Sequence, residues 1–125
     1  MSLRQAFEAE HLRREQERVA REDEERARQE ADHYNAQALH DRIAADAGFL
    51  ADKGLQLELS RYTVVLDHAD YRLRAYFEDG QINVTSADKR SASTPTAAPR
   101  KQEIVETVDD ALAVLAVFLA DEAPR

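Results

Sequence analysis

The sequence contains no cysteine, an absence that excludes disulfide bonds, thiolate metal sites and a cysteine nucleophile. It contains only three glycines, Gly48, Gly54 and Gly80, and their spacing excludes a glycine-rich loop that cradles phosphate. No stretch approaches the roughly 20 apolar residues of a membrane-spanning helix, and the first residues lack the apolar segment of a secretory signal. We therefore expect a cytoplasmic protein, and the excess of arginine over lysine, 14 to 3, is typical of a GC-rich bacterial genome.

Positive charge is scarce as well. The chain has 17 Lys and Arg residues against 25 Asp and Glu residues, a net charge of -8. The deficit is even, because residues 1–54 hold 9 basic against 13 acidic side chains and residues 55–125 hold 8 against 12. Affinity for nucleic acids and anionic membranes comes largely from basic side chains that contact phosphates. An evenly acidic chain is therefore a poor candidate for binding either of them.

A long helix is predicted at the start of the chain. Ser2 and Gln5 have the spacing of a capping box, in which each side chain satisfies a free backbone N–H group of the first turn. Neither proline nor glycine follows before Gly48. The preferred end is Gly54, because Lys53 suits the last turn and glycine suits the C-cap. An end at Gly48 is the alternative.

The first part of this helix, residues 1–33, is predicted to be a charged helical arm. From residue 13 to residue 33 the apolar residues are only Val19, Ala20, Ala27 and Ala31. Opposite charges four residues apart stabilise a solvated helix by about 0.2–0.5 kcal/mol per pair. The pairs in the favourable order are Glu10/Arg14, Glu17/Arg21, Glu22/Arg26 and Glu24/Arg28. Such an arm would extend about 45 Å at 1.5 Å per residue.

The arm also carries a thin apolar repeat. Leu12 and Val19 are seven residues apart, and Ala27, Ala31, Tyr34 and Ala38 follow at spacings of 4, 3 and 4. This pattern is typical of a coiled coil, although Gln16, Asp23 and Arg26 interrupt it. We prefer self-association through this helix. A single exposed arm, a disordered segment and docking along another protein are the alternatives.

Residues 34–125 are predicted to form a small α+β domain. An apolar stripe attaches the long helix to it through Tyr34, Ala38, Leu39, Ile43, Ala47 and Leu50. Asp79-Gly80 between two alternating runs predicts a type I′ hairpin that pairs Glu78 with Gln81, Phe77 with Ile82 and Ala75 with Val84. One face of this hairpin then collects its apolar side chains, which are Tyr71, Leu73, Ala75, Phe77, Ile82 and Val84.

The remaining elements complete the predicted fold. Residues 61–66 form a third strand, and the alternating leucines of 55–59 are out of phase with it, which indicates a break near Ser60 and leaves one strand or two open. Residues 88–102 are predicted to be a flexible loop, and Thr107 to Ala120 a helix capped by Thr107. The predicted class is α+β, with a long N-terminal helix, a three-stranded antiparallel meander and a C-terminal helix packed on one sheet face.

The residues with possible chemistry are few. Asp67, His68 and Asp70 cluster on a predicted turn, but a turn favours aspartate in any case, so an enzyme is the least favoured class. We predict a non-enzymatic protein-interaction module, an adaptor, regulator or assembly factor, that forms a homodimer and binds a protein partner without a cofactor or metal. The candidate partner-binding residues are Leu12, Val19, Arg72, Arg74, Tyr76, Val117 and Phe118. The alternative is a nucleic-acid-associated regulator that uses the Arg and Tyr side chains of the hairpin.

Overall fold

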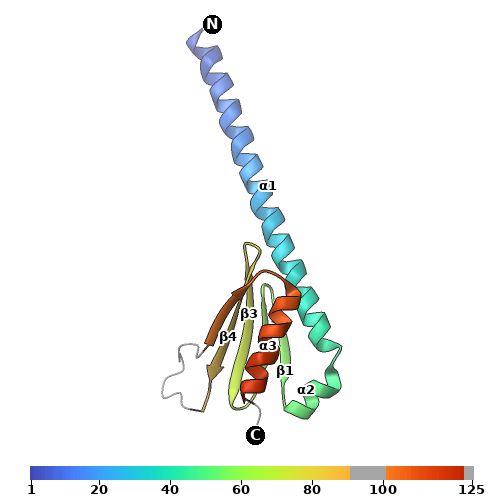
Figure 1. The fold of residues 1–125 in the computed structure, drawn as a ribbon. Helices are drawn as coiled ribbons and strands as arrows, with labels where there is room; N and C mark the ends of the chain where they lie inside the picture. Colours follow the sequence, from blue (N-terminus) through green and yellow to red (C-terminus); the bar gives the residue numbers. More distant parts are fainter. Residues whose placement is uncertain (91–100, 123–125) are drawn as a thin grey trace.

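The computed structural model describes residues 1–90 and 101–122. Its elements, in chain order, are α1 (Leu3–Ala44), α2 (Ala47–Lys53), β1 (Gln56–Ser60), β2 (Thr63–Asp67), β3 (Tyr71–Glu78), β4 (Gln81–Asp88), β5 (Lys101–Val105) and α3 (Val108–Glu122). Figure 1 shows the first part of α1 projecting well beyond the sheet, while its second part and α3 lie on the same face of the sheet. The predicted α+β class is confirmed.

The sheet is an antiparallel meander of five strands in the order β1-β2-β3-β4-β5, so the prediction of three strands was wrong. The hairpin itself has the predicted register, with Phe77 opposite Ile82 and Ala75 opposite Val84. Asp79 and Gly80 have φ values of 51° and 78°, as a type I′ turn requires. The local sequence therefore determines the register of the central pair of strands.

Residues 55–66 form two strands, which answers the question that the alternation of leucines left open. Ser60 pairs with Thr63 across a tight turn, in which Arg61 has a φ of 50°. The turn residues 61 and 62 bring the alternation of the two strands into register. Leu57 therefore lies opposite Leu66, and Leu59 lies opposite Val64. The predicted break near Ser60 is confirmed.

Strand β5 was missed. It pairs with β4 from Ile82 opposite Val105 to Ser86 opposite Lys101, and β4 itself extends to Asp88. The ends of the predicted loop 88–102 are therefore strand, and its centre, residues 91–100, lies outside the described residues. The signal was weak because KQEIV has no clear alternation, and its strand conformation depends on the neighbouring β4.

The core lies between the helices and one face of the sheet. All six residues predicted for the inner face of the hairpin are buried. α3 covers them with Ala111, Val114, Leu115 and Phe118. The Thr107 hydroxyl accepts a hydrogen bond from the Asp110 amide at 3.0 Å, so the predicted cap is confirmed. None of the described helices lies on the opposite face of the sheet, which we call the outer face (Figure 1).

The long helix differs from the prediction in two respects. It ends at Ala44, and a separate short helix, α2, continues to the predicted C-cap Gly54, whose φ is 67°. The buried stripe of α1 is Asp32, Ala36, Leu39 and Ile43. Tyr34, predicted for this stripe, is instead 74% exposed. A spacing of 4, 3 and 4 from position 32 decides the packed face, and Tyr34 lies on the other side of the helix.

Candidate functional site

The arm is a solvated helix. Residues 1–31 are exposed except for the half-buried Glu10. Leu12 is 59% exposed and Val19 45%, although both are apolar. Tyr34 is two positions from the buried Asp32, a rotation of about 200° at 3.6 residues per turn. The repeat that contains Leu12, Val19 and Tyr34 therefore lies on the side of α1 that faces away from its own domain.

Ion pairs along the arm confirm part of the predicted charge pattern. The Capping box of Ser2 and Gln5 is present, and Arg14 binds Glu10 at 3.0 Å. Arg13 also binds Glu10, and these two arginines lower the pKa of Glu10 to about 2. Other pairs differ from the prediction, since Arg26 lies 3.5 Å from Asp23 instead of pairing with Glu22. The arm thus holds its helix through pairs three and four residues apart.

Acidification should therefore unwind the arm. The pKa of Glu10 is below the 4.5 of a free glutamate, so its ion pairs stabilise the helix above about pH 4.5 and are lost as the pH falls towards 2. Far-UV circular dichroism should show a loss of helix in this range, reduced in Glu10→Gln. The matched control is Glu24→Gln, which removes a carboxylate that has no ion pair among the described residues and should leave the profile unchanged.

A buried carboxylate joins the base of the arm to the hairpin. Asp32 is 5% exposed, and its two oxygens accept hydrogen bonds from the backbone amides of Asp79 at 2.8 Å and Gly80 at 3.0 Å. Arg28, one turn earlier, lies 4.0 Å from the carboxylate of Asp79. Two hydrogen bonds to one side chain fix both the position of the hairpin turn and its direction relative to α1. The division between arm and domain at residues 33 and 34 stays a prediction, with Asp32 just inside the arm.

Arg72, Arg74 and Tyr76 lie together on the outer face of the sheet, as the pattern predicts. Arg74 is exposed and Tyr76 is 41% exposed. Arg72 binds the carboxylate of Asp67 at 3.0 Å, and Lys89 binds the same carboxylate at 2.9 Å, so Asp67 offsets only part of these two positive charges. Ile104 of β5, which is 56% exposed, shares a row with Tyr76 across Asn83. The outer face is consequently a mixed apolar and polar surface.

The two candidate residues on α3 differ in burial. Val117 is 58% exposed, on the side of the helix away from the sheet. Phe118 is 5% exposed and belongs to the core, with the Lys101 amine 5.8 Å from its ring centre. Phe118 is therefore not accessible to a partner, and we leave it out of the proposed interface.

The turn between β2 and β3 contains the Asp67, His68 and Asp70 cluster. Burial opposes ionisation of Asp67, but hydrogen bonds from Lys89 and Arg72 outweigh it and lower the pKa of this carboxyl. The Nδ1 atom of His68 accepts a hydrogen bond from the Asp70 amide at 3.0 Å. These bonds hold the turn, so the Asp67 carboxylate does not orient the His68 ring.

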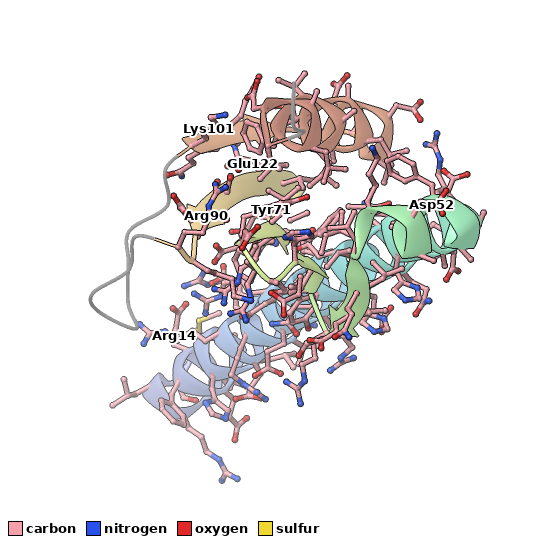
Figure 2. The ribbon with its side chains drawn as sticks, turned by 90° about the horizontal axis from the view of Figure 1, so that it is seen from below. Arg14, Asp52, Tyr71, Arg90, Lys101 and Glu122 are labelled. Carbon is pink, nitrogen blue, oxygen red and sulfur yellow. The ribbon has the colours of Figure 1, made fainter. Side chains whose placement is uncertain are left out.

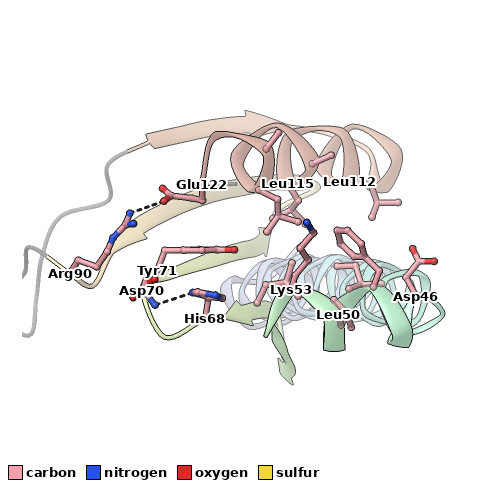
Figure 3. A pocket seen from close by; sticks show the side chains of 16 residues that line it. Asp46, Leu50, Lys53, His68, Asp70, Tyr71, Arg90, Leu112, Leu115 and Glu122 are labelled. Carbon is pink, nitrogen blue, oxygen red and sulfur yellow. Dashed lines mark hydrogen bonds and ion pairs between the residues drawn. The ribbon is translucent and has the colours of Figure 1, made fainter. Parts of the chain in front are cut away.

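A pocket of about 760 Å³ opens between α2, α3 and the β2–β3 end of the sheet, close to this turn (Figure 3). Leu50 and Leu66 line it together with Leu112, Leu115 and Leu119. Seen from below, Arg90 and Glu122 lie together beside Tyr71 at one end of the pocket (Figure 2). These two side chains form an ion pair of 2.8 Å.

Compared with known proteins, the chain matches no family model, no curated protein and no solved structure. Within residues 1–90 and 101–122, no helix is both long and apolar enough to cross a membrane. The same residues contain no group of three or more His, Asp or Glu side chains placed to hold a metal ion. The geometry of the surfaces and of the pocket is therefore the basis for the proposals below.

Sequence reasoning missed three features of these surfaces. Asp32 was assigned to the charged arm, and only its distance from the hairpin turn in space reveals its role. Ile104 was missed together with β5. The pocket has no sequence signal, because its walls come from α1, α2, α3 and two strands.

Proposed function

We propose that this chain is a cytoplasmic, non-enzymatic interaction protein that forms a homodimer through its arm and binds a protein partner on the outer face of its sheet. The observation that carries the proposal is the exposed apolar repeat of α1, which lies away from the domain. Leu12 and Val19 lie beyond the last turn of α1 that packs on the domain, so they contribute nothing to its core. A second copy would bury both.

Charge favours a parallel pair of arms. If Leu12 and Val19 occupy the seam, Glu8, Glu15 and Glu22 form one flank of it at seven-residue spacing. In a parallel pair Glu8 of one copy faces Arg13 of the other. An antiparallel pair would instead place the glutamate flanks against each other. Because the domain lies on the opposite side of α1 from the seam, two domains would sit outside a parallel pair without colliding.

The outer face supports the second half of the proposal. Tyr76, Arg74 and Ile104 are exposed there, and tyrosine and arginine are enriched at protein interfaces. The net charge of -8 disfavours a nucleic acid on this face. We therefore propose a protein partner.

Sedimentation equilibrium tests the dimer. The wild-type chain should dimerise reversibly in the micromolar range, because the seam is short and contains few large apolar residues. Val19→Glu should be monomeric at high micromolar concentration, since two carboxylates would meet in the seam.

The matched control is Phe7→Glu, which introduces the same charge at a residue that is 66% exposed. Phe7 lies about 140° around the helix from Leu12, off the seam, so this variant should dimerise like the wild type. A wild-type chain that stays monomeric at high micromolar concentration would contradict the dimer. Equal dimerisation of the Val19→Glu variant would place the interface elsewhere.

A further inference from the structure

The pocket between α2 and α3 has the character of a ligand site. Its volume of about 760 Å³ falls within the roughly 300–1,000 Å³ typical of small-molecule sites. Its apolar walls consist of five leucines, Ile43, Phe49 and two alanines of α3. The pocket lies between α2 and α3, next to the break between the end of α1 at Ala44 and the start of α2 at Ala47.

Tyr71 supplies the first polar group. It is only 7% exposed, yet its hydroxyl makes no hydrogen bond with any residue in the described part of the chain. Figure 3 shows this hydroxyl directed into the pocket. The ring of His68 stacks on the tyrosine ring, with centres 4.5 Å apart and planes 13° apart. The hydroxyl is reached by solvent through the pocket, so it is available to a ligand that displaces water.

Lys53 supplies the second polar group, from the last turn of α2. Figure 3 shows its amine directed over the pocket towards Leu115. The amine has no ion pair within residues 1–90 and 101–122. Burial and the nearby Glu122 and Asp70 raise the pKa of Tyr71, so its hydroxyl keeps its proton. Tyr71 and Lys53 are therefore both hydrogen-bond donors to a ligand.

The carboxylates that line the pocket leave these two donors available. Glu122 pairs with Arg90 at 2.8 Å, and Arg90 also pairs with Asp88 at 3.1 Å, so its cation is shared between two carboxylates. Asp46 lies at the opposite end of the pocket from Arg90 (Figure 3), and the side chains of Asp46 and Asp70 are exposed to solvent. The centre of the pocket thus combines apolar walls with one positive charge and one hydroxyl.

We propose that this pocket binds an amphipathic carboxylate, with its apolar chain between α2 and α3 and its carboxylate at the Tyr71 hydroxyl and the Lys53 amine. A carboxylate accepts both hydrogen bonds and neutralises the lysine. The apolar chain replaces water along the leucine walls. This proposal does not depend on self-association, because the seam of the arm is remote from the pocket.

Titration calorimetry of the full chain with decanoate, below its micelle-forming concentration, tests the site. One decanoate should bind per chain. Lys53→Gln should weaken binding about tenfold and Tyr71→Phe about fivefold, as expected for a charged and a neutral hydrogen bond. The matched control Tyr76→Phe removes an exposed hydroxyl from the outer face and should leave the affinity unchanged. Decanol should bind the wild type more weakly than decanoate and should not respond to Lys53→Gln.

Several outcomes would overturn the proposal. Absence of decanoate binding would do so, and so would equal binding of decanol. Lys53 is exposed, so Lys53→Gln should fold like the wild type and keep the test decisive even if Tyr71→Phe loses stability. Unchanged affinity in Lys53→Gln would show that the carboxylate of the ligand does not bind at Lys53. NMR signals of pocket residues that shift with protein concentration alone would identify a second copy as the occupant.

Discussion

Replacement of Leu39 by alanine is expected to destabilise the domain by about 3–4 kcal/mol, because it leaves a cavity in a packed core. Leu39 is 0% exposed and lies in the buried stripe of α1. Urea denaturation followed by tyrosine fluorescence, at a protein concentration low enough to avoid association, measures the effect.

The same substitution elsewhere on α1 is a matched control. Leu12→Ala removes an equal volume from a residue that is 59% exposed, and alanine is as good a helix former as leucine. The stability of the domain should then change by less than about 0.5 kcal/mol. The dimer should weaken, because Leu12 lies in the proposed seam. Equal destabilisation by both substitutions would show that the arm belongs to the cooperative unit of the domain.

Asp32→Ala is expected to cost about 3 kcal/mol and to loosen the arm at its base. The substitution removes two hydrogen bonds that the buried Asp32 carboxylate accepts from the amides of the exposed turn residues Asp79 and Gly80. Hydrogen exchange gives a local measurement, because these two amides should exchange much faster while those of β2 stay protected. The free energy of unfolding should fall in the same variant.

Asp23→Ala is the control for this variant. It removes the same carboxylate from the same helix, at a position where the side chain is exposed and, among the described residues, pairs only with Arg26. Stability and amide exchange of the hairpin should stay unchanged. Hairpin amides that remain protected in Asp32→Ala would show that the turn holds without its clamp.

The elements that could be predicted are those whose causes lie within a few residues. The capping box at Ser2, the type I′ turn at Asp79-Gly80 and the C-cap at Gly54 follow from side-chain chemistry at fixed spacing. The inner face of the hairpin follows from alternation, since a change of register by one residue would expose every apolar side chain.

The candidate site could be predicted only in part, for the same reason. Arg72, Arg74 and Tyr76 share a face because alternation places them there. Phe118 was assigned to a partner surface, since the last helix has a broad apolar face and the sequence does not show which part the sheet covers. Tyr71 was predicted to be buried, but its unpartnered hydroxyl has no counterpart in the sequence pattern.

The sequence by itself determined the long charged helix, the central hairpin and the caps, because local interactions select these conformations before any distant contact forms. The tertiary structure decided the rest. It selected Asp32 and Ala36 over Tyr34 for the packed face of α1, since the hairpin turn offers two free amides to a carboxylate. It made KQEIV a strand by pairing it with β4, and it formed the pocket between α2 and α3. Each of these depends on contacts between residues far apart in the chain, which local pattern does not encode.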